Sequence, residues 1–510
     1  MADDSSGRFT YDAELRTVAK GGGLGLLGKL GNQTLALIAG PVTARLIGPA
    51  AYGLIQLSAS LNDLLQVLLS FGLSMSITKF VSIYESEGRR DLSRGAVAGA
   101  LAICVGAAAG VALAVAVYPE FVTERIYDKP QWGPVLQLMI LILPLGVAAG
   151  LMIPATIARR TIVYRMLTDL LLRPITLAGV LVFCGALGLG AQGAAGAYLI
   201  AKTVGAGIAF AGVRRLIGRL APHDVRNFEG RRLMSVALPL LLTQLARFGL
   251  FRVNNLIGGR WLTDKELGQY SAASRLATSG LVGKITIGAM FAPIISSLHH
   301  QGRRDELQRM FETTTRWGHY LALPAMMIAI AKAPSAMHLF GQEFVDAGPA
   351  LQVLAMGQIV NTSVGPLPAL IGMADLHWLS ALNNTLAACV NIALCVLLTP
   401  RMRVVGLAAA GAVATTAVNT LRVIEAFFLL RISPYAWRAV KPVFAAVLAG
   451  PVLYFVRFES WAVDLVVPSV IFVLVYMLLV RLIGLDSDDN DVLDALKKRL
   501  LRLRIRAAKD

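Results

Sequence analysis

Long apolar runs separated by short polar loops set the pattern of this chain. Most runs extend for about 20 residues or more, the length that an α-helix needs to cross the hydrocarbon core of a bilayer. The pattern predicts about fourteen transmembrane helices, at residues 22–46, 51–83, 95–117, 132–158, 166–188, 191–213, 233–258, 267–297, 312–337, 349–374, 377–399, 404–430, 442–457 and 461–484. A composition of 56% hydrophobic and 15% charged residues is also too apolar for a soluble globular protein. We therefore predict an all-α integral membrane protein.

Basic loop residues predict how the chain is oriented. Lys and Arg concentrate in alternate loops, on the side of the polar N-terminus, which is the bias of cytoplasmic loops. The N-terminus lacks the features of a secretory signal, and an even number of spans returns the C-terminus to the same side. We expect a multi-pass protein of the cytoplasmic (inner) membrane with both termini in the cytoplasm. The net charge of +17 then reflects topology and does not indicate a nucleic-acid partner.

The two halves of the chain repeat one pattern. ARLIGPAAYG (44–53) precedes a long span that ends at GRRD, and GRWLTDKELGQY (259–270) precedes a comparable span that also ends at GRRD. An offset of 215 residues separates Arg45 from Arg260. Transporters are commonly built from two such bundles around the substrate. We predict two six-helix lobes at residues 1–222 and 223–430, two additional transmembrane helices at 431–484, and a cytoplasmic amphipathic tail at 485–510.

Motifs for enzymatic chemistry find little support. Gly23, Gly25 and Gly28 spell GxGxxG, but no strand precedes them, so the context of a dinucleotide-binding turn is missing. The four cysteines and six histidines lack the spacing of a zinc site or a disulfide framework. Paired carboxylates and a nucleophile with its base are also missing from the pattern. We expect a transporter without cofactor or metal, and not a membrane enzyme such as a glycan polymerase or ligase.

Charged residues inside the predicted spans mark the candidate site, because a charge in hydrocarbon is costly and usually lines a cavity. Bases outnumber acids in these spans. Some bases are expected to pair with an acid on the same helix or to reach the interface, namely Arg173, Arg422, Lys79, Arg316 and Lys332. The remaining bases are Lys29, Lys202, Arg247, Arg252, Arg275 and Lys284. Asp63 can pair with at most one of them and is the candidate for ion coupling.

Polar residues accompany these bases, mostly in the first two helices of each half. They are Asn32, Asn254, Asn255, Ser271 and Asn384. Bases without acids favour an anionic ligand, and guanidinium groups match phosphate oxygens bidentately. The sequence therefore predicts a cationic cavity for an anionic substrate.

Residues 43–91 carry a resemblance to a known group of proteins. The turn after the first span contains Ile47, Gly48, Pro49, Tyr52 and Gly53. It resembles the leucine-glycine-proline-x-x-tyrosine-glycine turn of the polysaccharide branch of the multidrug, oligosaccharidyl-lipid and polysaccharide (MOP) exporter superfamily, with isoleucine in place of leucine. The resemblance extends over the whole chain in length, helix count and duplicated lobes.

This resemblance implies a flippase for isoprenoid-pyrophosphate-linked oligosaccharide in cell-surface polysaccharide biosynthesis, working by alternating access. Lys29, Arg247, Arg252 and Arg275 would then hold the pyrophosphate, and the five polar residues would bind sugar. Expected partners are the anionic lipid-linked glycan, membrane lipids and, in association, glycan polymerase or export proteins. The alternative is a cation-coupled drug or small-molecule exporter, which requires an essential carboxylate, with Asp63 as the candidate.

Overall fold

The computed structural model describes the backbone of residues 5–281, 284, 288, 291, 297–298, 300–373, 377–431 and 437–484. It describes the side chains of these residues except 5–30, 32–33, 369, 372–373, 377, 430 and 437–439. Lys29 and Asn32 therefore lie outside the described side chains, and the predicted tail at 485–510 lies outside the described residues.

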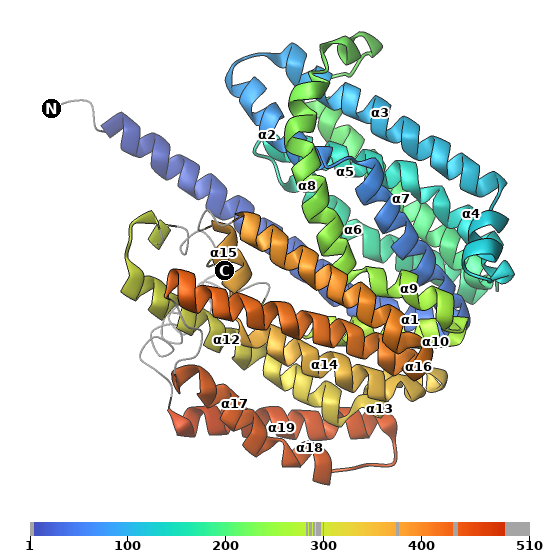
Figure 1. Ribbon diagram of the computed structural model, residues 1–510, viewed down its shortest axis with the longest axis vertical. Coiled ribbons are helices and arrows are strands. Elements are labelled where there is room, and N and C mark those ends of the chain that lie inside the picture. The colour runs from blue at the N-terminus through green and yellow to red at the C-terminus, as the bar shows by residue number, and fades with distance from the viewer. Residues whose placement is uncertain are drawn as a thin grey trace, which may run out of the picture. The chain divides into compact units, whose positions relative to one another are not determined.

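The described secondary structure is helical throughout (Figure 1). Up to residue 281 the elements are α1 (Ser5–Leu69), α2 (Leu73–Ser86), α3 (Arg90–Val117), η1 (Phe121–Ile126), η2 (Pro130–Trp132), α4 (Gly133–Ile140), α5 (Ile142–Ala158), α6 (Val163–Val180), η3 (Leu181–Ala186), α7 (Gly190–Leu216), η4 (Pro222–Asn227), α8 (Gly230–Phe251), α9 (Val253–Trp261) and α10 (Asp264–Ser279). From residue 300 onward they are α12 (Arg304–Ala331), α13 (Ala333–Met337), η5 (Gln342–Ala347), α14 (Gly348–Ser363), α15 (Leu367–Met373), α16 (His377–Glu425), η6 (Ala426–Leu430), α17 (Trp437–Ala449), α18 (Pro451–Phe455) and α19 (Trp461–Ile483).

Among the described residues, eight helical segments are long and apolar enough to cross a membrane. They are Thr34–Leu69, Arg90–Val117, Pro130–Ala158, Val163–Ala186, Gly190–Leu216, Gly230–Phe251, Trp378–Leu429 and Trp461–Ile483. The predicted fold class, an all-α integral membrane protein, is confirmed. The count of fourteen spans stays a prediction.

Backbone breaks divide the two longest helices where the sequence predicts loops. Gly48 has φ 78° inside α1, and Arg403 has φ 53° inside α16. A third break was not predicted: Gly72, with φ 73°, separates α1 from α2 within the expected span 51–83. A Cβ at Gly72 would lie 2.1 Å from the carbonyl oxygen of Ala237 on α8. The prediction of one uninterrupted helix is wrong here because a left-handed glycine and a close backbone approach bend the chain.

Contacts divide the chain into two compact units. Unit 1 comprises Met1–Arg275, Met337–Ala350 and Asn384–Ala414, and unit 2 comprises Leu276–Ala336, Leu351–Asn383 and Thr415–Asp510. The units are defined by packing and the predicted lobes by sequence duplication, so the lobe boundaries stay a prediction. In unit 1, α2, α3, α5 and α7 share a core of buried Leu, Ile, Val and Ala side chains. In unit 2, α12, α17 and α19 pack together around Phe472 and Tyr476 (Figure 1).

Charged contacts between helix ends and loops of unit 1 form what we call the clasp. Lys129 forms an ion pair with Asp264 and donates to the carbonyl oxygen of Leu262 at 3.0 Å. Arg403 binds both carboxylate oxygens of Glu266, with N···O distances of 2.9 and 2.5 Å. Arg45 donates to the carbonyl oxygens of residues 338 and 339, each at 2.8 Å. The clasp thus ties together loops that are far apart in the sequence.

The clasp gives stability a dependence on pH. Burial alone would raise the pKa of Glu266, but hydrogen bonds from Arg403 and Thr263 outweigh it and lower that pKa. Because the unfolded-state pKa is about 4.3, this stabilisation is present above that pH and is lost as the pH falls through the folded-state pKa. We expect Glu266→Gln to lower the free energy of unfolding by about 1 kcal/mol or less at pH 7, since both groups are partly exposed. Thermal unfolding of both proteins at pH 7 and below pH 4 tests this, because the difference should vanish at acid pH.

Candidate substrate site

Four bases from different elements of unit 1 form what we call the cationic cluster: Arg173 on α6, Lys202 on α7, Arg252 between α8 and α9, and Arg275 on α10. Arg173 interacts electrostatically with Arg275 and Arg252, and Lys202 with Arg173 and Arg252. Among the described acids, Asp63 and Asp169 act on Lys202. Within this set of described residues, four bases face two acids.

Asp63 of α1 is bound by one member of the cluster. Its carboxylate accepts from Arg252 at 3.2 Å, and the side chains are 41% and 66% exposed. Both side chains are therefore partly open, and Arg252 has room to contact a ligand as well.

Arg275 is held by two tyrosines. It donates to the hydroxyl of Tyr52 at 3.1 Å and also hydrogen-bonds Tyr198 on α7. Gly40 makes room for it, because a Cβ at that position would lie 2.9 Å from the Arg275 Nε. Packing against α1 and these hydrogen bonds thus fix the guanidinium in place.

Amide and hydroxyl side chains form a chain beside these bases. Ser271 donates to the Asn255 side-chain oxygen at 3.3 Å, and Asn255 donates to the Ser60 hydroxyl at 3.1 Å. Asn254 accepts from Asn391 at 2.8 Å and is buried. The hydrogen bonds of Asn254 support the joint between α8, α9 and α16, so its role toward a sugar stays a prediction.

Two further predicted residues lie in unit 1. Arg247 is exposed on α8, one turn after Gln244, whose amide nitrogen is buried without a hydrogen-bond partner among the described residues. Asn384 is buried on α16. The structure therefore brings Lys202, Arg252 and Arg275 into one cluster, and the part that Arg247 and Asn384 would play toward a substrate stays a prediction.

Lys284 belongs to a different set of contacts, in unit 2. It donates to the backbone carbonyl of Asn361 and, at 3.0 Å, to the side-chain oxygen of Asn361. Asn419 also donates to that oxygen, at 3.3 Å, and Arg422 donates to Asn419 at 3.1 Å. Helix α14 ends two residues later, so Lys284 supplies a positive charge at a helix C-terminus.

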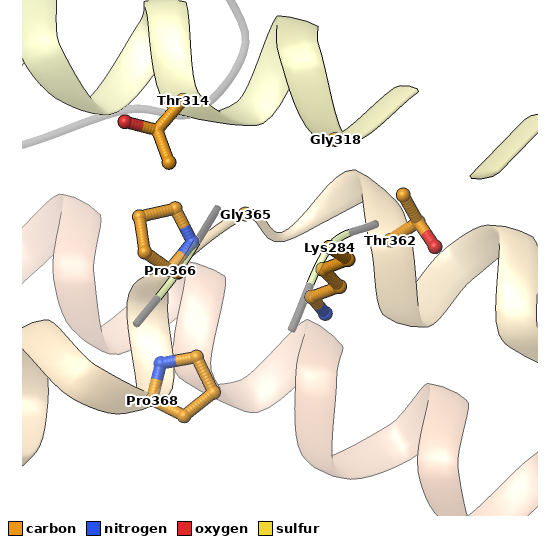
Figure 2. Close-up of a pocket in the computed structure, with 8 residues that line it drawn as sticks. Lys284, Thr314, Gly318, Thr362, Gly365, Pro366 and Pro368 are labelled. Atoms are coloured by element: carbon orange, nitrogen blue, oxygen red, sulfur yellow. The ribbon is translucent and has the colours of Figure 1, made fainter. Parts of the chain in front are cut away.

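A cavity of about 170 Å³ adjoins Lys284. Its lining includes Thr314 and Gly318 of α12 and the break between α14 and α15 at Gly365 and Pro366. Figure 2 shows Lys284 beside Thr362, with Thr314 above Pro366. The lining residues all fall within unit 2.

Comparison with known proteins decides the family. The polysaccharide biosynthesis protein family matches residues 18–299, more than half of the chain. The chain belongs to this family. The chain is also 23% identical, over 72% of its length and 73% of the relative's, to the succinoglycan biosynthesis transport protein ExoT of Rhizobium meliloti (strain 1021).

Solved structures of other proteins share the fold of this chain. The lipid II flippase MurJ, in its inward closed conformation, matches with a TM-score of 0.74 at 12% identity, over 89% of this chain and 97% of that one. An inward-facing multidrug resistance transporter of the MATE family, in the MOP superfamily, matches with a TM-score of 0.64 at 14% identity. The match covers 77% of this chain and 93% of that one. The resemblance to the MOP superfamily is confirmed. The protein is thus a membrane protein of the polysaccharide biosynthesis protein family that has the fold of membrane transporters of the MOP superfamily.

Sequence reasoning did not select three residues of the candidate site. Arg173 was expected to pair locally with Asp169, yet its charge also acts on Arg275 and Arg252. Tyr52 and Tyr198 carry no charge, so the search for charged residues inside spans did not select them. Tyr52 does belong to the motif after the first span. Arg316 and Lys332 were expected to extend to the interface, and in the structure both are buried by protein, with 1% and 3% of the residue exposed.

Proposed function

We propose that this transporter flips an isoprenoid-pyrophosphate-linked oligosaccharide across the cytoplasmic membrane for cell-surface polysaccharide biosynthesis. The observation that carries the proposal is the cationic cluster in unit 1. Its guanidinium groups match phosphate oxygens bidentately, and they come from three different elements, so they can surround a headgroup. The names of two similar proteins support the proposal, one a succinoglycan biosynthesis transport protein and the other a lipid II flippase.

Transport would proceed by alternating access, with the two repeats moving around the bound headgroup. Arg252, Arg275, Arg173 and Lys202 would bind the pyrophosphate, while Asn255 and Ser271 would bind sugar. Of the residues predicted from sequence, Arg247, Lys29 and Lys284 would meet the substrate along its path, as would Asn32, Asn254 and Asn384. The orientation would place both termini in the cytoplasm, and glycan polymerase or export proteins would act next.

The experiment that tests the function uses proteoliposomes with a labelled isoprenoid-pyrophosphate oligosaccharide on one leaflet. We expect rapid movement to the other leaflet with the protein and none with empty vesicles. The double variant Arg247→Ala, Arg252→Ala should lose most of this activity, by about 100-fold if two contacts of roughly 1.5 kcal/mol each are lost. Arg303→Ala is the matched control, because this arginine is exposed, precedes α12 and pairs with Glu306 in the first turn of that helix. Undiminished flipping in the double variant would remove these residues from the site.

The alternative, a cation-coupled exporter of the MATE type, is tested in the same vesicles with an organic dye cation. Its candidate coupling residue, Asp63, is already bound by Arg252. Dye movement that Asp63→Asn abolishes, without lipid movement, would replace the flippase proposal.

A further inference from the structure

Two glycines occupy equivalent positions in the duplicated halves. The offset of 215 residues that relates Arg45 to Arg260 also relates Gly53 to Gly268 and Pro49 to Asp264. Pro49 follows the break at Gly48 in α1, and Asp264 is the first residue of α10. Each glycine therefore lies one turn into the helical stretch that opens the second span of its half.

These equivalent helix starts cross each other with backbones in contact. A Cβ on Gly53 would lie 2.3 Å from the carbonyl oxygen of Asp264 and 2.8 Å from the nitrogen of Gly268. A Cβ on Gly268 would lie 2.0 Å from the carbonyl oxygen of Pro49 and 3.1 Å from the nitrogen of Gly53. The contact is reciprocal, so it lies where a two-fold axis relating the halves would pass. Small residues at such a crossing allow helices to approach more closely than any side chain permits.

The clasp and an aromatic cluster surround this crossing. Asp264, whose carbonyl faces Gly53, is held through its side chain by Lys129 and by Gln131 at 2.7 Å. Tyr52, next to Gly53, packs edge to face against Phe340 and Phe344, with ring centroids 6.3 and 6.2 Å apart. Loops from both halves therefore stabilise one closed arrangement.

The same two helices carry the cationic cluster. Asp63 lies ten residues beyond Gly53 on α1, and Arg275 lies seven residues beyond Gly268 on α10. Arg275 is also bonded to Tyr52, directly beside the crossing. Separation of the helix starts would widen the bundle at the clasp end and give access to the cationic cluster further along these helices. An anion that draws Arg275 away from Tyr52 would remove one of the contacts that hold the crossing together.

We propose that the Gly53–Gly268 crossing is the closure of the transport pathway at the clasp end, which must separate to release substrate. The proposal rests on the proposed function, whose orientation places the clasp outside the cell. This structure holds that closure shut. A methyl group on either glycine is incompatible with it, because Cβ atoms do not approach backbone atoms within 3.0 Å.

The test measures access to the pathway without any substrate. Ser60→Cys, at a site 4% exposed, is introduced with the four native cysteines replaced, and intact cells are treated with a membrane-impermeant maleimide. Gly53→Ala or Gly268→Ala should raise the labelling rate at least about tenfold. Gly106→Ala and Gly110→Ala are matched controls, because a Cβ there would meet nothing within 4 Å, and they should label at the parental rate.

Parental labelling rates in both Gly53→Ala and Gly268→Ala, with normal membrane insertion, would overturn the proposal. If one of these variants fails to accumulate, the other decides, because each reports on the same crossing from a different helix. Labelling requires no lipid cargo, so a failure of lipid flipping would overturn the proposed function and leave this result standing.

Discussion

Flipping of a pyrophosphate-linked oligosaccharide should fall by about 100-fold or more when Arg275 is replaced by methionine. Losing one partner of a desolvated, hydrogen-bonded charge pair costs 2–5 kcal/mol or more, and each 1.4 kcal/mol is a factor of ten. Arg275 lies in the cationic cluster, and we expect its guanidinium to bind a phosphate oxygen of the substrate. Arg275→Lys keeps the charge but loses the planar fork, and should be intermediate. Initial flipping rates in proteoliposomes measure all three proteins.

A headgroup comparison separates binding from packing. The wild-type protein should move a pyrophosphate-linked lipid faster than a monophosphate-linked lipid, and Arg275→Met should reduce that preference. Tyr52→Phe removes the 3.1 Å bond to Arg275 but leaves the charge, and should stay close to wild type. An Arg275→Met protein that keeps the wild-type headgroup preference would show that Arg275 acts only in packing.

Hydropathy and duplication predicted the parts of the fold that depend on local sequence. Long apolar runs gave the helices, and the repeat anchored at Arg45 and Arg260 points to the Gly53–Gly268 pair. The break at Gly72 could not be predicted, because it depends on the backbone of Ala237 more than 160 residues away.

The candidate site was predictable as far as it consists of bases that lack a nearby acid in the sequence. That rule selected Lys202, Arg252 and Arg275, which the structure brings together. It failed for Arg173, because Asp169 four residues earlier made a local pair the simpler expectation. It also grouped Lys284 with the others, whereas its contacts lie in unit 2. Spacing along one helix identifies partners on that helix and says nothing about neighbours from other helices.

Lys332 is another base whose partner lies on a different helix. Replacing it should have the largest effect on stability. Its ammonium binds Asp464 of α19 at 2.6 Å and the carbonyl oxygen of Val456 at 2.9 Å. The two side chains are only 4% and 14% exposed. Lys332→Met would leave the Asp464 carboxylate buried without its cation, and breaking a buried pair costs about 3–5 kcal/mol. We expect a lower unfolding temperature for this variant in detergent, measured by thermal unfolding.

The double variant Lys332→Met, Asp464→Leu distinguishes a buried charge from lost packing. When both partners become apolar no charge is left without a partner, and such replacements are often neutral. The double variant should therefore be closer to wild type than Lys332→Met alone. The exposed pair Lys265–Asp346, 4.0 Å apart in unit 1, is the control, and Lys265→Met should leave the unfolding temperature within experimental error. If the double variant were as unstable as the single one, the pair would stabilise α19 against α12 through specific hydrogen bonds, such as that from Ser335 to Asp464 at 2.7 Å, and the buried charge would not be the cause.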